Sequence, residues 1–238
     1  MDFKFQVSDS ATYQALACDC KELRRRNRKL GSWEVRIAAM YSQISTLISA
    51  LEKCGALKHA SVRSAIQEFA ACIGDEDYRT HMVGEMAVSL AEAGQFREAD
   101  CLAATLAGLE KSSFLIKIAE IEMQAGEDEL AASTYDSARK AALEHSFPTQ
   151  RSQAVAAIAG SVERFGKWET SARLWQMAVG LAQDGQVRGG TDGPEAAGVL
   201  LDAAEAFRRN GDREQAERIA KSIIIEGLRN RALKKISD

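Results

Sequence analysis

From about residue 79 onward, apolar residues recur at spacings of three and four, which is the period of one face of an α-helix. Each periodic stretch leads to a glycine, and a second periodic stretch follows it. The four glycines are Gly94, Gly126, Gly166 and Gly211. Large apolar residues stand eleven positions before them (Val83, Leu115, Val155, Leu200) and eight positions before three of them (Met86, Ile118, Ile158), with Ala203 before the fourth. The pattern therefore predicts pairs of helices joined at the glycines.

Small residues flank each glycine at fixed distances on both sides. Seven positions before stand Ala87, Ala119, Ala159 and Ala204, and five positions after stand Ala99, Ala131, Ser171 and Ala216. A glycine at the end of a helix can take the left-handed conformation that reverses the chain. Two helices joined by so short a turn approach closely, and only small side chains allow that approach. We therefore expect antiparallel helical hairpins.

This arrangement of small residues and turn glycines resembles the tetratricopeptide repeat (TPR). The bulky residue of the second helix in that family matches Tyr135 and Trp175, whereas Ala103 and Ala220 stand there in the outer units. The steps between the glycines are 32, 40 and 45 residues, against about 34 in the family. The resemblance covers about residues 79–238. It implies an all-α fold, a right-handed superhelical solenoid of antiparallel helix–turn–helix (TPR-like) repeats.

The longer steps contain candidate loops. Residues 184–193 hold four glycines, and we expect a mobile surface loop there, followed by a helix with Pro194 in its first turn. Residues 231–237 repeat the pattern of a first helix, so the chain ends in a capping half-repeat or was cut from a longer protein. Residues 1–78 are less regular, and we interpret them as N-terminal helical hairpins packed on the solenoid.

Composition supports helices and sets limits on function. The chain has only two prolines, few for the frequent turns of a β-sandwich or barrel, and its aromatic content is low at 6%. A net charge of −3 argues against a surface made wholly for nucleic acid. Basic residues are dense in one run only, formed by Lys21, Arg24, Arg25, Arg26, Arg28 and Lys29. Its interpretations are a solvated helix face, which we favour, a nucleic-acid or acidic-lipid patch, or a docking surface for an acidic partner.

No catalytic or cofactor motif is present in the sequence, so we expect neither an enzyme nor a cofactor or metal site. The five cysteines are scattered and are expected to pack as small apolar residues in a reducing compartment. The three histidines, His59, His81 and His145, are expected at the surface or at helix ends. No signal-peptide pattern and no long apolar stretch occurs. We expect a cytoplasmic protein, with secretion by a route that needs no cleaved signal left open.

The resemblance also implies a site, because the first helices of such repeats line a concave surface that binds peptides. The polar positions that would face inward are Glu92, Glu120, Gln124, Gln153, Glu163, Arg164, Glu205, Arg208 and Arg209. This groove would be acidic in its first half and gain arginines toward the C-terminus. The basic clamp with which chaperone-binding members hold acidic tails is absent from the matching positions, so that partner is not expected.

The sequence thus favours a non-catalytic scaffold or adaptor that binds a protein or peptide partner along the concave face. Two alternatives remain: a self-assembling structural or regulatory protein that forms a homodimer, and nucleic-acid binding through the basic helix 21–29, which the lack of interleaved aromatic residues makes less favoured. Neither a membrane nor a small-molecule substrate is expected as a partner.

Overall fold

The computed structural model describes residues 76–106, 110–188 and 193–237, without the side chains of residues 76–78 and 188. The chain divides into two compact units, one ending at Gly126 and the other starting at Glu127, and each is described by itself. Every regular element within the described residues is an α-helix. Helices that precede a turn glycine, and α12, are called A helices, and those that follow one are called B helices.

Within its described residues, the first unit has one complete hairpin and one further A helix. These are α4 (Glu76–Glu92), α5 (Phe96–Ala104) and α6 (Lys111–Ala125), with α6 packed on both α4 and α5. The ring of Phe114 lies against Gly84 of α4, where a side-chain methyl group would collide with it. Glycine therefore lets α4 and α6 pack closely at this point.

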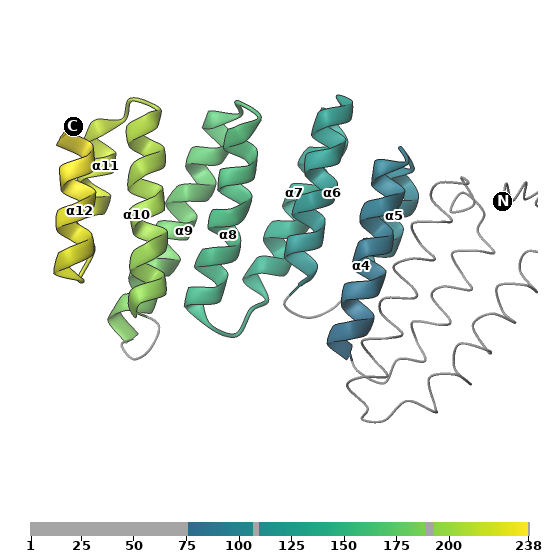
Figure 1. The fold of residues 1–238 in the computed structure, drawn as a ribbon, viewed down its shortest axis with the longest axis horizontal. Coiled ribbons are helices and arrows are strands. Elements are labelled where there is room, and N and C mark those ends of the chain that lie inside the picture. The colour runs from purple at the N-terminus through teal and green to yellow at the C-terminus, as the bar shows by residue number, and fades with distance from the viewer. Residues whose placement is uncertain (1–75, 107–109, 189–192, 238) are drawn as a thin grey trace, which may run out of the picture. The chain divides into compact units, whose positions relative to one another are not determined.

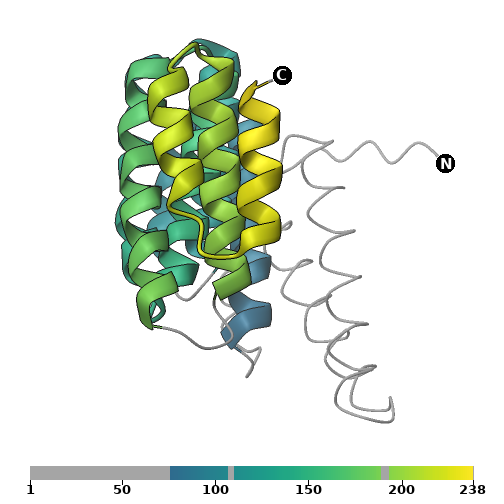
Figure 2. The same cartoon turned by 90° about the vertical axis from the view of Figure 1, so that its left-hand side faces the viewer.

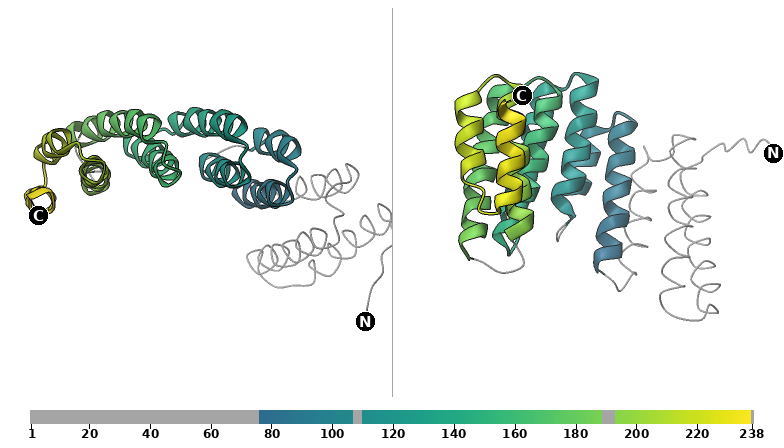
Figure 3. Two further views of the ribbon diagram at one scale, coloured as in Figure 1. Left: turned by 90° about the horizontal axis from the view of Figure 1, so that it is seen from above. Right: turned by 60° about the vertical axis from the view of Figure 1, so that its left-hand side comes forward.

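The described residues of the second unit form six helices, which lie in two rows, as Figure 1 and, from above, Figure 3 show. The A helices α8, α10 and α12 form one row, and the B helices α7, α9 and α11 form the other. Their bounds are α7 (Asp128–Leu143), α8 (Pro148–Arg164), α9 (Trp168–Arg188), α10 (Gly193–Arg209), α11 (Arg213–Lys221) and α12 (Glu226–Ser237). Helix α10 is central, since it packs on α8, α9, α11 and α12.

The turn glycines have the predicted left-handed backbone. Their φ values are 74°, 83°, 71° and 85° at Gly94, Gly126, Gly166 and Gly211. The eight small residues that flank them, Ala87, Ala99, Ala119, Ala131, Ala159, Ser171, Ala204 and Ala216, are each 1% exposed or less. The prediction of TPR-like helical hairpins in an all-α chain is therefore confirmed for the described residues.

Three buried hydroxyl groups inside this tight packing have hydrogen-bond partners. The Ser171 hydroxyl, which replaces the alanine of the other units, donates to the carbonyl of Ala159 at 2.8 Å. The Tyr135 hydroxyl lies 2.7 Å from that of Ser161, and both residues are buried. These bonds matter because a buried hydroxyl without a partner costs about 1–3 kcal/mol. The core of the second unit thus accepts these hydroxyl groups where a neighbouring helix satisfies them.

The predicted loop at 184–193 is wrong over its first half and at its end. Helix α9 continues to Arg188 and α10 begins at Gly193, so Pro194 lies in a first turn as expected. Gln186 keeps the end of α9 helical, because its buried side chain donates to the carbonyl of Ser222 at 3.3 Å and accepts from the amide of Ile224 at 3.0 Å. Residues 189–192 lie outside the described residues, so mobility there stays a prediction.

The C-terminal stretch forms the expected A helix. Helix α12 buries Ala232 and Ile236 and packs on α10 and α11. The N-terminal hairpins predicted for 1–78 and the basic run at 21–29 lie outside the described residues, apart from the start of α4. The two units are described separately, so the handedness of the superhelix also stays a prediction.

Candidate functional site

The predicted groove positions all lie on A helices and are open to solvent to different degrees. Glu92, Gln124, Gln153, Arg164, Arg208 and Arg209 are exposed, and Glu120, Glu163 and Glu205 are half-buried. Their role as the lining of a partner-binding groove stays a prediction. The periodicity that suggested them did not predict which of them contact one another.

Glu163 of α8 is the most connected of these residues. Its carboxylate accepts hydrogen bonds from the Arg209 guanidinium at 3.1–3.3 Å and from the Asn210 amide at 3.1 Å, both at the end of α10. The indole Nε1 of Trp175, on α9, donates to the same carboxylate at 3.3 Å. The Glu163 side chain is only 15% exposed. Donors on three residues, Trp175 of α9 and Arg209 and Asn210 at the end of α10, therefore fix one carboxylate near the C-terminal end of α8.

A second ion pair continues this arrangement to the last helix. Lys235 of α12 pairs with Glu205 of α10. Asp202 lies near both, one turn before Glu205. Burial, and then the neighbouring charge of Glu205, raise the pKa of the Asp202 carboxyl, while Arg209 and Lys235 oppose the shift. Five charged groups thus interact electrostatically across α8, α10 and α12.

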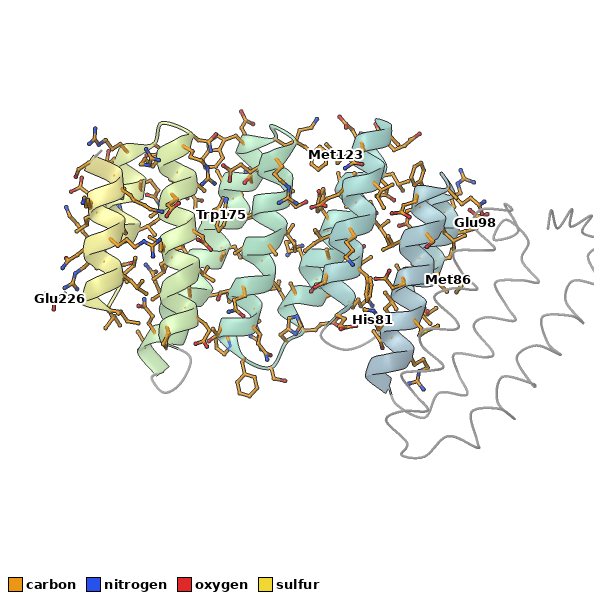
Figure 4. All side chains as sticks on the ribbon, in the orientation of Figure 1. His81, Met86, Glu98, Met123, Trp175 and Glu226 are labelled. Carbon is orange, nitrogen blue, oxygen red and sulfur yellow. The ribbon has the colours of Figure 1, made fainter. Side chains whose placement is uncertain are left out.

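We call Glu163, Asp202, Glu205, Arg209 and Lys235 the charged row. It contains three acidic and two basic residues, and two ion pairs link one A helix to the next. Arg208 lies beside it on α10, exposed, and makes no ion pair with a described residue. The row can therefore offer both a cation and an anion to a bound segment. Figure 4 shows Trp175 between α8 and α10.

The first unit has a different A-helix cluster, built around an aromatic ring. His81 of α4 meets the ring of Phe114 edge-on, with centroids 5.5 Å apart, and its Nδ1 lies 3.2 Å from the carboxylate of Glu110. Lys117 lies 5.1 Å from the centre of the same ring and pairs with Glu85 at 3.4 Å. His81 was expected at the surface or at a helix end. It lies within α4, at the surface, with 34% of its side chain exposed.

Several residues of the second-unit site were missed by the sequence analysis, namely Asp202, Lys235, Asn210 and Trp175. One signal could have found two of them, because Asp202 and Lys235 occupy the same repeat position, immediately before Ala203 and Ile236. The pairing itself has no local signal, since Glu163 and Arg209 are 46 residues apart. Repeat register gives the face, and only the packing of helices gives the contacts.

Of the remaining candidate residues, Cys101 departs from the expectation, whereas His145 lies at a helix end as expected. Cys101 is exposed, so its expected role as a packing residue is wrong. His145 follows α7 and is buried, with a pKa lowered first by burial and then by Arg151. In the part of the chain that the structure describes, no His, Cys, Asp and Glu side chains gather as a metal site. None of the described helices has the length and apolar character to cross a bilayer.

Comparisons with known proteins give a limited result. No protein-family model and no curated protein matches the chain. Two similar solved structures are of a Podosopora anserina protein assigned as a kinesin light chain, with nearly identical TPR-like repeats, and one of the two is a single-residue variant. The variant shares 16% identity at a TM-score of 0.42 and covers 81% of this chain and 96% of its own. The other shares 16% at 0.41 and covers 76% and 92%. At these TM-scores the likeness carries no argument about function or partner.

Proposed function

We propose that this protein is a non-catalytic scaffold that binds a segment of a partner protein along the A-helix face of its second unit. The observation that supports it is the charged row. Its members come from three successive A helices, and ion pairs join each helix to the next. A segment lying across these helices would meet charged groups at positions that the packing of the helices holds fixed.

The ion pairs of the row suit exchange with a partner. Arg209 and Lys235 keep side-chain exposures of 51% and 40%, and partly exposed pairs contribute at most about 1 kcal/mol each. A partner's charged group can therefore replace one member at small cost. Charge complementarity of this kind gives orientation and selectivity more than raw affinity.

Two groups at the row define the chemistry of the expected segment. The raised pKa of Asp202, due mainly to burial and then to Glu205, means that a basic side chain placed beside it would stabilise its charged form. Arg208 is exposed on the same helix and can bind an acidic group. We therefore expect a segment that carries a Lys or Arg and, further along, an Asp or Glu.

The same pairing makes acid–base catalysis a poor fit. A general base needs a carboxylate that is within reach of substrate and able to accept a proton. The Glu163 carboxylate accepts from three donors, and Glu205 pairs with Lys235. Two of the three acids of the row are thus occupied in holding helices together, which supports a binding role.

The test is affinity capture on the full chain with a charge-reversed row. Asp202→Lys with Arg208→Glu inverts both open groups, whereas Arg173→Glu inverts an exposed charge on the B helix α9 and is the matched control. Proteins captured by the wild type and the control should be depleted about tenfold by the double variant, as a loss of about 1.4 kcal/mol predicts. Unchanged capture by a double variant with normal circular dichroism would contradict the proposal.

Two alternative functions that the sequence suggests remain predictions. Nucleic-acid binding rests on residues 21–29, which lie outside the described residues. Formation of a homodimer and a cytoplasmic location likewise stay predictions. No contact or charge in the described helices supports nucleic-acid binding or a homodimer more strongly than it supports binding of a segment at the charged row.

A further inference from the structure

The two ion pairs of the charged row differ in how firmly they are held. The Arg209 guanidinium forms three hydrogen bonds with the carboxylate of Glu163, one from Nε and two from Nη2. That carboxylate also accepts from two further side chains. The Lys235 ammonium, in contrast, forms one hydrogen bond, with a single oxygen of Glu205. The pair between α10 and α12 is therefore the weaker of the two.

The helix that carries Lys235 is also less buried than its neighbour. Helix α12 buries two of its twelve residues, whereas α10 buries nine of seventeen. Figure 2 shows α12, in yellow, alongside α10, on which it packs. Lys235 reaches α10 from there on a flexible four-carbon stem, and 40% of its side chain is exposed. Its ammonium can thus leave Glu205 for water without any movement of α12.

Lys235 lies beside more negative charge than it neutralises. Asp202 and Glu205 are three positions apart on α10, a spacing that places two side chains next to each other on a helix surface. Lys235 bonds to Glu205 only. The pKa of the Asp202 carboxyl is raised by burial and then by the charge of Glu205, although two nearby cations oppose the shift. A cation that contacted both carboxylates would therefore be held more firmly than Lys235 is.

We propose that Lys235 is an internal competitor, which holds the place beside Asp202 and Glu205 until an arginine of the partner segment replaces it. This exchange rests on the function proposed above, since it takes place when a segment binds to the charged row. Arginine is favoured over lysine because its planar guanidinium has five donors and can bond two carboxylates at once. A lysine offers only what Lys235 already supplies.

The competition sets the affinity of the charged row for its segment. A site that is occupied from within binds a ligand more weakly, in proportion to the fraction of molecules in which it is free. Because a partly exposed ion pair is weak, Lys235 should reduce the affinity for an arginine-bearing segment by no more than about fivefold. Segments without a well-placed arginine gain too little from the exchange, so Lys235 selects against them.

The test is calorimetric titration of the full chain with a short peptide that carries one Arg and, one helical turn further on, one Glu. Lys235→Gln removes the competing charge and should lower the Kd of the peptide about two- to fivefold. Lys234→Gln removes an exposed charge from the same helix and is the matched control, which should leave the Kd unchanged. Lys235→Arg should raise the Kd instead, because a guanidinium on α12 can itself bond both carboxylates.

A second peptide, with Lys in place of Arg, tests the choice of cation. The wild type should bind it at least about threefold more weakly than the Arg peptide. Equal affinity for the two peptides would overturn the proposal. So would the same Kd in the Lys235→Gln and Lys234→Gln variants, or tighter binding by Lys235→Arg than by the wild type.

The outcomes also separate this exchange from the function on which it rests. The exchange alone is wrong if Lys235→Gln and Lys234→Gln bind the peptide equally while the Asp202→Lys, Arg208→Glu variant still loses its captured proteins. Absence of peptide binding to Lys235→Gln overturns the exchange in every case. Together with unchanged capture by the charge-reversed variant, it overturns the scaffold as well.

Discussion

The two ends of the second unit are built on different physical rules. At the turn end, Gly166 and Gly211 have left-handed backbones, and a methyl group on either would touch nothing within 4 Å. At the connection end, Gln186 is buried and bonded to residues 36 and 38 positions away. The turn end is thus formed by backbone conformation and small residues within a few positions of each other. The connection end is formed by contacts between distant parts of the chain.

The difference between the two ends shows where the chain tolerates changes in repeat length. The steps between turn glycines grow from 32 to 40 and 45 residues, and the added length enters at the connection end. The turn geometry stays constant, because φ differs by only 14° between the smallest and largest values, 71° and 85°. Hairpins are therefore the constant units of this chain, and the connections are where it departs from a regular repeat.

The largest expected effect is at the small-residue crossing near the turn end. Ala159 is fully buried between α8 and α9, whereas Ala157 on the same helix is exposed. Ala159→Leu should lower the free energy of unfolding by about 2–3 kcal/mol, because the helices cannot separate without losing their other contacts. Ala157→Leu should change it by less than about 0.5 kcal/mol. Urea unfolding measures both, and similar values for the two variants would refute the close-crossing explanation.

At the connection end, Gln186→Ala should be the next most damaging change. It removes an acceptor from the amide of Ile224 and a donor from the carbonyl of Ser222. We expect a loss of about 1–2 kcal/mol, together with faster hydrogen exchange at the Ile224 amide. Gln176→Ala, on the exposed side of α9, is the control. If exchange at Ile224 is unaffected, Gln186 does not hold this end together.

The same Gly→Ala substitution should have opposite effects on stability at Gly166, in a turn, and at Gly180, inside α9. Gly166 has φ of +71°, so Gly166→Ala should cost about 1 kcal/mol even though space is available. Gly180 lies inside α9 with an ordinary helical backbone and open space around it. Gly180→Ala should therefore stabilise the chain by up to about 1 kcal/mol. Thermal melts of the two variants should move in opposite directions, and shifts of the same sign would argue against the backbone origin of the turn.

The smallest effect concerns pH and the connection end. Burial, then Arg151, lowers the pKa of His145, so the unfolded chain takes up a proton near pH 6.5 where the folded chain does not. The free energy of unfolding should be constant with respect to this group above about pH 6.5 and should decrease as the pH falls below it. His145→Asn should flatten the dependence of Tm on pH between about 5 and 7. The carboxyls with lowered pKa, Asp136 and Glu217, contribute to the pH dependence only below about pH 5. An unchanged slope in the His145→Asn variant would exclude His145 as its source.

The predictable part of this fold follows the same division. Turn glycines and small residues could be read from the sequence because their spacing is local and their requirement is steric. The end of α9 could not, because aspartate and glycine at 184–185 favour a loop until the distant contacts of Gln186 are known. The charged row falls between these cases. Helical period places Glu163 and Arg209 on polar faces, but their contact depends on how α8 packs on α10.

Trp175 contacts the charged row directly, so its fluorescence can report on changes in the row. Its indole is 5% exposed and donates to the carboxylate that also holds Arg209. A ligand that draws Arg209 away from Glu163 changes the electric field across the indole, and its emission spectrum changes with that field. Binding on the charged row can therefore be followed in the unlabelled protein by tryptophan fluorescence.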